Sequence, residues 1–212
     1  MYMGLFDNIK NAFTSELKSK GTQAVNNAVS KGINSATNAA NNVGKGKKSK
    51  QSFTFQAVPT SVDELKALPE ATLDSAFKTV ALTMIALCNY VNDKEATFEM
   101  LNYLKGPEDF SLSDKQAVTQ RLTGKEYIVT SFFDGATVEN NYTCSKPYSI
   151  TVYENPYSFD EENWAMMFVK SAGADSERVV KLRKKPSTGQ WFLADIQCLD
   201  GIRTPLSQDK WA

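Results

Sequence analysis

The sequence predicts an α+β fold: N-terminal helices pack on one face of an antiparallel β-meander, and a helical amphipathic arm precedes them. Three observations predict it. The longest apolar run, residues 73–91, has helical periodicity, and shorter helix-like segments lie on either side of it. Residues 148–197 then alternate apolar and polar positions in short stretches. Helices first and strands later is typical of α+β domains.

The run at residues 73–91, LDSAFKTVALTMIALCNYV, is predicted to be the core helix. A helix this apolar is normally covered by other elements, so we expect the sheet to pack against it. Its main apolar side chains recur at the i, i+3, i+4 spacing of one helix face: Leu73, Phe77, Val80, Met84, Leu87 and Val91.

Three shorter helices are predicted around this core helix. A capping-box pattern that begins at Ser61 opens a helix to residue 68, and a helix at 94–104 follows the core helix. A second capping-box pattern, which begins at Ser113, opens a helix that ends near Leu122.

The remaining segments favour strands and short turns. Residues 52–58 alternate as a strand does, and residues 127–133 are rich in β-branched and aromatic side chains, so both are predicted to be strands. Four consecutive strands follow, and their links are short and rich in Pro, Gly, Ser, Asp or Asn, which favours an antiparallel meander. They are predicted at residues 148–154, 164–171, 177–184 and 190–197.

The irregular tail contains two side chains for which we expect a structural role. Trp211 is predicted to pack against the folded body, because an indole ring carries much apolar surface. Arg203 is predicted to pair with an acidic residue of the core, in preference to binding a substrate.

Charge is distributed unevenly along the chain. Residues 1–50 contain eight lysines and two acidic residues, a net charge of +6, and the other 162 residues carry −6. A basic arm on a mildly acidic body indicates contact with something anionic or with a membrane surface, unless the lysines only keep the arm soluble. We therefore divide the chain into an arm at 1–43, a basic flexible linker at 44–52 and a globular domain at 53–212.

The arm has two periodic segments. The first places two phenylalanines and aliphatic side chains on one helical face with lysines at its border, which suits a lipid headgroup region or a protein groove. The second has a face of small residues, which lets helices approach closely and favours hairpins or self-association. The predicted interaction face comprises Leu5, Phe6, Ile9, Phe13, Leu17, Val25, Val29 and Ile33.

The composition excludes several kinds of chemistry. The 212 residues contain no histidine, so Ser-His-Asp and Cys-His catalysis within this chain are ruled out. Three scattered cysteines cannot complete a zinc site, and no nucleotide-binding glycine motif occurs. We predict no catalytic residue, no metal site and no cofactor. The linker is too short and lacks the aromatics expected for specific nucleic-acid binding.

The expected location is the cytoplasm, either free or at the periphery of a membrane. The first ten residues lack the pattern of a secretory signal, and the run at 73–91 contains charged and polar positions that make it a poor membrane span. The odd number of cysteines, without any CxxC pattern, fits reduced thiols.

Aromatic and acidic clusters provide the remaining candidate sites. Aromatic residues crowd positions 142–164, and on a sheet face they could line a ligand groove. The candidate groove residues are Tyr148, Tyr153 and Trp164, although such residues are also ordinary strand formers. The acidic run at 160–162 could bind a hard cation, but a solvated loop is the simpler interpretation.

Two resemblances follow from particular motifs. The WFL, GIRTP and WA segments near the C-terminus, with the strand pattern before them, resemble an uncharacterised family of bacterial domains of unknown function, over about residues 53–212. This resemblance implies a fold but no activity and no site. The MGLFD opening is similar to that of several bacterial cytoplasmic and peripheral proteins, and its GLFD start resembles that of amphipathic peptides that lie on bilayers.

Three functions are therefore open. The first is a non-enzymatic protein whose arm mediates association with a membrane surface, with a protein partner or with a second copy in a homo-oligomer. The second is a small-molecule or peptide-binding module that uses the sheet face, by analogy with cystatin-like and NTF2-like folds. The third is a histidine-free enzyme that uses a pair of carboxylates.

Overall fold

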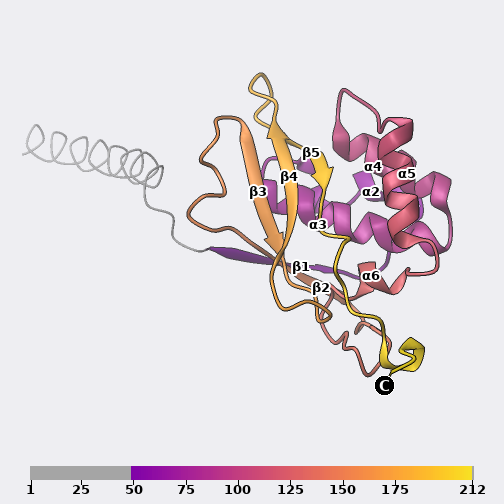
Figure 1. Ribbon diagram of the computed structural model, residues 1–212. Helices are drawn as coiled ribbons and strands as arrows, with labels where there is room; N and C mark the ends of the chain where they lie inside the picture. The colour runs from indigo at the N-terminus through magenta and orange to yellow at the C-terminus, as the bar shows by residue number, and fades with distance from the viewer. Residues whose placement is uncertain (1–48, 212) are drawn as a thin grey trace, which may run out of the picture. The chain divides into compact units, whose positions relative to one another are not determined.

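The computed structural model describes residues 49–211, and the boundary between the two units of the chain falls between Gly46 and Lys47 (Figure 1). The predicted arm, 1–43, and most of the linker, 44–52, lie outside the described residues. So do all the arm's predicted interaction residues, which are Leu5, Phe6, Ile9, Phe13, Leu17, Val25, Val29 and Ile33.

One antiparallel sheet organises the described part of the chain. Its strands stand in the order β1-β2-β3-β4-β5, so the last four form a meander and β1 is added at the edge of β2. The predicted α+β meander is thereby confirmed. The strands are β1 (Lys50–Phe55), β2 (Tyr148–Tyr153), β3 (Trp164–Val169), β4 (Arg178–Lys184) and β5 (Trp191–Ile196).

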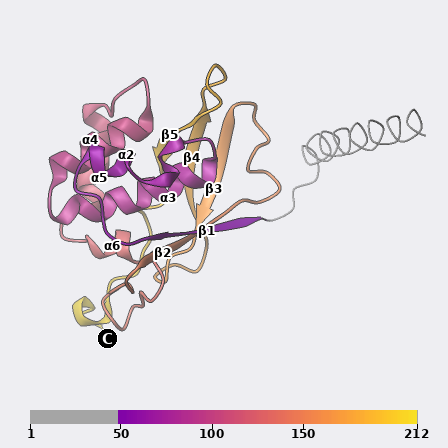
Figure 2. The ribbon, with the colours of Figure 1, turned by 180° about the vertical axis from the view of Figure 1, so that it is seen from behind.

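The helices come almost entirely between β1 and β2 in the sequence. Figures 1 and 2 show that α2 to α5 gather on one side of the sheet, which we call the inner face. The elements are α2 (Val62–Lys66), η1 (Pro69–Thr72), α3 (Ala76–Leu87), η2 (Cys88–Val91), α4 (Lys94–Lys105), α5 (Leu112–Leu122), α6 (Tyr127–Thr130) and, near the C-terminus, η3 (Leu206–Gln208).

α3 is the centre of the hydrophobic core. Every residue of this helix except Lys78 is buried, and its neighbours include the strands β1, β2, β3 and β5. The predicted core helix is therefore present but shorter than 73–91, because it tightens into the 3₁₀ turn η2 after Leu87. Val91, which we expected on the buried side, is 65% exposed because it lies on that turn.

Strand alternation separates the two faces of the sheet. On β2, β3 and β4 the alternate residues that face the helices are buried, as in Ile150, Met167 and Leu182. Their neighbours point to the opposite side, which we call the outer face. No helix of residues 49–211 covers that face in either ribbon view (Figure 2). The outer face is therefore the part of the sheet available for contacts.

The predicted strand at residues 127–133 is wrong. Residues Tyr127–Thr130 form the one-turn helix α6. Its buried side chains Ile128 and Val129 are followed four positions later by the buried Phe132 and Phe133, which is helical spacing. The β-propensity of branched and aromatic residues reflects how they pack, so it is overridden when a turn buries them against the core.

Two smaller expectations also need correction. The helix expected to begin with a capping box at Ser113 instead has its capping box at Ser111 and Asp114. Trp211 does not pack against the body and is 96% exposed. Arg203 does pair with an acidic residue, but its partner Asp175 lies on the surface and not in the core.

The two halves of the sheet diverge. β2 and β3 pair only at Val152 with Val169 and at Tyr153 with Phe168, whereas β3 and β4 pair along their whole length. The segment between β2 and β3 folds back beside the first half of β3, where the Met166 N–H donates to the Ser158 carbonyl at 2.9 Å. This segment forms a wall beside the outer face.

The far edge of β5 is covered by the chain that leads into α3. The Trp191 N–H donates to the Leu73 carbonyl at 2.8 Å, and the Thr79 hydroxyl donates to the Trp191 carbonyl at 2.8 Å. After α4, the chain passes Gly106 and comes close to the Phe192 ring. The β5 edge is thus satisfied within the fold, as exposed strand edges usually need to be.

The contact at Gly106 makes a first prediction. Gly106 has a φ of +86°, and a Cβ there would lie 2.4 Å from the Phe192 ring, so Gly106→Ala should destabilise by about 1–3 kcal/mol. Gly124→Ala is the matched control, because Gly124 has a φ of +72° with nothing within 4 Å. Urea denaturation of both variants would contradict the account if Gly124→Ala cost as much as Gly106→Ala.

Candidate binding sites

A row of three side chains crosses the outer face near the start of β3. Trp164 on β3 pairs with Arg183 on β4, which in turn pairs with Phe192 on β5. Directly opposed residues share one face of a sheet, so these three side chains lie side by side. The Arg183 guanidinium carbon lies 5.3 Å from the centroid of the Trp164 ring. The row therefore presents a cation between two aromatic rings.

A cavity of about 600 Å³ lies over this row. Its floor is the start of β3, the end of β4 and the first half of β5, and its sides come from the segment after α4 and from the β4–β5 hairpin. The volume lies within the range typical of small-ligand sites. It is lined by Lys105, Pro107, Glu108, Glu162, Asn163, Trp164, Arg183, Lys184, Lys185, Pro186, Phe192, Leu193 and Ala194.

A second cavity, of about 460 Å³, is also lined by Trp164. Its walls are the segment that folds back beside β3 and the side chains of Met166 and Lys181, which pair across β3 and β4. Tyr157 and Met166, which line it, are two of the few large apolar side chains that are exposed, at 66% and 39%. We call these two cavities, which share Trp164 as a lining residue, the outer groove.

The outer groove has positive charge on its floor and negative charge on its rim. Lys181 and Arg183 project from β4 along the floor, while the exposed acidic residues 160–162 stand on the rim. Among residues 49–211, Arg121 and Arg203 pair with carboxylates and Arg178 bonds to Ser176 and Gly201. The described residues place no hydrogen-bond or ion-pair partner on the Arg183 side chain.

The wall after α4 is held in place by an ion pair and a helix cap. Lys105 Nζ lies 2.8 Å from Asp114 Oδ2 and 4.7 Å from the centroid of the Phe110 ring. Asp114 also accepts from the Ser111 N–H as part of the capping box of α5. The Lys105 ammonium, followed by the Ser111 bonds, lowers the pKa of the Asp114 carboxyl.

The sequence-predicted groove residues do not come together. Trp164 lies at the centre of the outer groove, but Tyr153 pairs with Phe168 at the other end of β3. Tyr148 shares the inner face with Ile150 and packs edge-on against Phe133, with ring centroids 6.1 Å apart. Alternation along β2 puts the two tyrosines on opposite faces, because they are five positions apart.

The acidic run at 160–162 lies in the exposed link before β3. Within residues 49–211, no group of three His, Cys, Asp or Glu side chains lies close enough to hold a metal ion. Glu108 and Glu162 face the same cavity from different segments, and both are exposed.

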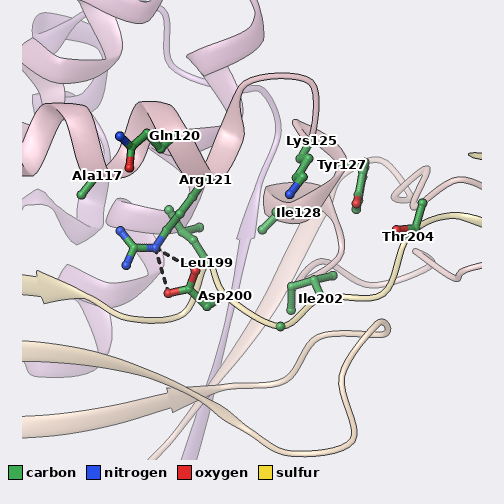
Figure 3. A pocket seen from close by; sticks show the side chains of 11 residues that line it. Ala117, Gln120, Arg121, Lys125, Tyr127, Ile128, Leu199, Asp200, Ile202 and Thr204 are labelled. Carbon is green, nitrogen blue, oxygen red and sulfur yellow. Dashed lines mark hydrogen bonds and ion pairs between the residues drawn. The ribbon is translucent and has the colours of Figure 1, made fainter.

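A third cavity lies between α5, α6 and the C-terminal tail, with a volume of about 480 Å³ (Figure 3). Arg121 Nε bonds to both oxygens of Asp200, at 2.9 and 2.8 Å, and so ties the tail to α5. Ile128 and Ile202 lie between that pair and the side of the pocket where Lys125 and Tyr127 stand. The Arg121 guanidinium in this pocket is already paired with the Asp200 carboxylate, so the Arg121–Asp200 pair acts chiefly to hold the tail.

The three thiols are poor nucleophiles. Burial raises the pKa of Cys198 to about 12 and also raises the pKa of Cys88. The pKa of Cys144, which is half-buried, is raised for the same main reason. The thiolate is the reactive form of cysteine, so a raised pKa lowers reactivity at neutral pH.

Sequence reasoning identified Trp164 but missed its partners. Arg183 and Phe192 come together with Trp164 only because of strand register, and Lys105 and Pro107 arrive from a distant helix end. The one usable signal was the basic alternation of residues 181 and 183, which indicates a polar-facing side of the strand but not its neighbours.

The family of the chain follows from comparison with known proteins. Residues 57–206 match the family model described as a domain of unknown function, DUF6935, and the chain belongs to this family. Neither the comparison with curated proteins nor that with solved structures gave a match. As for membranes, none of the helices within residues 49–211 has the length and apolar character needed to span one.

The pKa of Asp114 gives a prediction for stability against pH. Its folded pKa is lowered, so its contribution is present above the ordinary Asp pKa of about 3.9 and is lost as pH falls through the folded value. Asp114→Asn should cost less than about 1 kcal/mol at pH 7, because the pair is partly exposed and screened by solvent, and the cost should be smaller at about pH 3. Equal losses at both pH values in urea denaturation would refute this role.

The burial of the thiols predicts the order in which they react. At pH 8 an aromatic disulfide reagent should modify Cys144 first, and Cys198 should react only at the rate of unfolding, because it is fully buried. Mass spectrometry of partially modified protein identifies the order, and Cys144→Ser is the control. Rapid modification of Cys198 in the folded protein would contradict the burial.

Proposed function

We propose that the protein is a non-enzymatic cytoplasmic protein whose N-terminal arm attaches the DUF6935 domain to a membrane surface, to a second copy of the chain or to a larger assembly. The arm's apolar face, Leu5, Phe6, Ile9, Phe13 and Leu17 with Val25, Val29 and Ile33, would make the contact. An amphipathic helix bordered by lysines has the chemistry for this role.

The observation that carries the proposal is the closed core of the domain. Residues from Phe55 to Leu199 supply one continuous hydrophobic cluster around α3, and the unit boundary at Gly46/Lys47 precedes all of it. The described residues thus supply a large core among themselves, while the sequence gives residues 5–17 an apolar helical face of their own. An apolar face of this kind needs a surface to cover it.

The chemistry of the domain also supports a non-enzymatic role. The whole chain has no histidine, the thiol pKa values are raised by burial, and five described carboxylates are engaged in ion pairs: Asp74, Asp114, Asp175, Glu177 and Asp200. Groups whose pKa values are shifted toward neutrality within a cleft are the usual mark of acid–base catalysis. The pKa values of the thiols are raised and those of Asp74 and Asp114 are lowered, so these shifts lead away from neutrality.

A second candidate is a ligand-binding module that uses the outer face of the sheet, and the outer groove favours it. Trp164, one of the predicted groove residues, stands between its two cavities. An NTF2-like pocket between the core helix and the sheet has less support, because α3 is packed there with its side chains buried. A carboxylate enzyme would have to use Glu108 and Glu162, and it has the least support of the three.

The attachment proposal is tested on the full chain with two matched pairs of substitutions. Ile9→Asp with Phe13→Asp places two charges on the apolar face, and Asn8→Asp with Asn11→Asp places the same two charges on the opposite face. The first pair should abolish flotation with vesicles that contain anionic lipid, or reduce the mass in light scattering, because a carboxylate is costly in an apolar contact.

The control pair should leave the mass unchanged. It should reduce flotation only through electrostatic repulsion between the added carboxylates and the anionic lipid, and about 0.3 M salt should screen that repulsion. The proposal fails if the unmodified chain neither floats nor self-associates. It also fails if the two pairs have the same effect at high salt.

A further inference from the structure

We propose that the outer groove binds an extended peptide segment that carries one carboxylate beside an apolar or aromatic side chain. The inference rests on the second candidate function, binding at the sheet face, and it is independent of the arm. The charge, the apolar surface and the length of the groove each indicate the kind of ligand that would bind there.

Arg183 supplies the reason for a carboxylate. Its guanidinium lies over the Trp164 ring and opposite Phe192, and the described residues give it no carboxylate partner. A planar guanidinium binds a carboxylate through two parallel hydrogen bonds, and aromatic neighbours hold it in one plane. Lys181 on the same strand and Lys185 on the hairpin add positive charge along the floor.

The apolar surface of the groove supplies the reason for a neighbouring side chain. Trp164, Phe192 and Pro107 surround the guanidinium on the larger cavity, and Met166 and Tyr157 extend the apolar surface into the smaller one. The exposed fractions of Met166 and Tyr157, 39% and 66%, are large for apolar side chains on a folded surface. A ligand with apolar groups on both sides of its charge would cover both cavities.

The shape of the groove favours a chain over a compact molecule. Its cavities of about 600 and 460 Å³ share only Trp164 in their lining, and each alone has the size of a small-ligand site. An extended peptide advances about 3.3 Å per residue and places successive side chains on alternate sides. Such a segment can cross the Trp164 indole and place side chains in both cavities.

The acidic rim argues for a single carboxylate and against a polyanion. Asp160 and Glu161 line the smaller cavity, and Glu108 and Glu162 line the larger one. A nucleic acid or an anionic bilayer would bring repeated negative charge against these side chains, which like-charge repulsion disfavours. One carboxylate centred on Arg183 meets the cations of the floor and leaves the rim free for the positive groups of the peptide.

The test uses the full chain and two immobilised libraries of N-acetylated, C-amidated hexapeptides. Each member of the first library carries one Glu beside Phe, Leu or Trp, and the second has Gln in place of Glu. The first library should retain the protein and the second should not. The best Glu peptide is then titrated by calorimetry against the unmodified chain, where we expect measurable binding that weakens between 50 and 300 mM salt.

Variants locate the binding. Arg183→Gln should weaken it about tenfold or more, and Trp164→Leu should also weaken it, since a charged hydrogen bond and an aromatic contact are each removed. Arg203→Gln is the matched control, because Arg203 is exposed and pairs with Asp175 away from the groove, and it should change affinity less than twofold. Arg183 is exposed, so an unchanged thermal midpoint is expected for Arg183→Gln.

Four results would overturn the proposal, and the last of them would spare the broader sheet-face function. The first is that no Glu peptide binds more tightly than about 1 mM or than its Gln counterpart. The second is equal weakening by Arg203→Gln and Arg183→Gln. The third is displacement of the best peptide by a thymidine 12-mer in an Arg183-dependent way, which would assign the groove to nucleic acid. Binding of a free aryl carboxylate that depends on Arg183, without any peptide binding, would refute the peptide but leave the sheet-face function standing.

Discussion

The burial of α3 against the inner face of the sheet is the contact on which the rest of the structure depends. Eleven of its twelve residues are buried, and the strands supply Ile150, Met167 and Leu193 to the same cluster. Each buried aliphatic side chain stabilises the fold by about 1.5–3 kcal/mol relative to exposure, before the loss of chain entropy is counted. This contact commits the inner face to the core and leaves only the outer face of the sheet open.

The outer groove is a consequence of how the strands end. β2 leaves β3 after two residue pairs, so the link between them folds back beside the first half of β3 and forms one wall. The chain after α4 turns at Gly106, comes round the β5 edge against Phe192, and forms the opposite wall. Register then places Trp164, Arg183 and Phe192 in one row between the walls. The candidate site is thus built by segments far apart in the chain.

The fold could be predicted from the sequence largely because its signals are local. Period-two alternation located β2 to β5 within a few residues, and the apolar run located α3. The failures occurred where tertiary packing decides: the β-branched segment that begins at Tyr127 became a helical turn, and Trp211 has no apolar surface to cover it. Of the groove, only Trp164 could be predicted. The strand register and the approach of the segment after α4 to β5 leave no local pattern in the sequence.

Native-state hydrogen exchange of the full chain tests the central role of α3 most directly. If α3 is the centre of one cooperative core, the amides of Ala81 to Leu87 exchange only through global unfolding and share one free energy with the central strands β3 and β4. The same free energy should be obtained from denaturant unfolding. Exchange of the α3 amides through a partial opening at lower free energy, while β3 and β4 stay protected, would contradict the account.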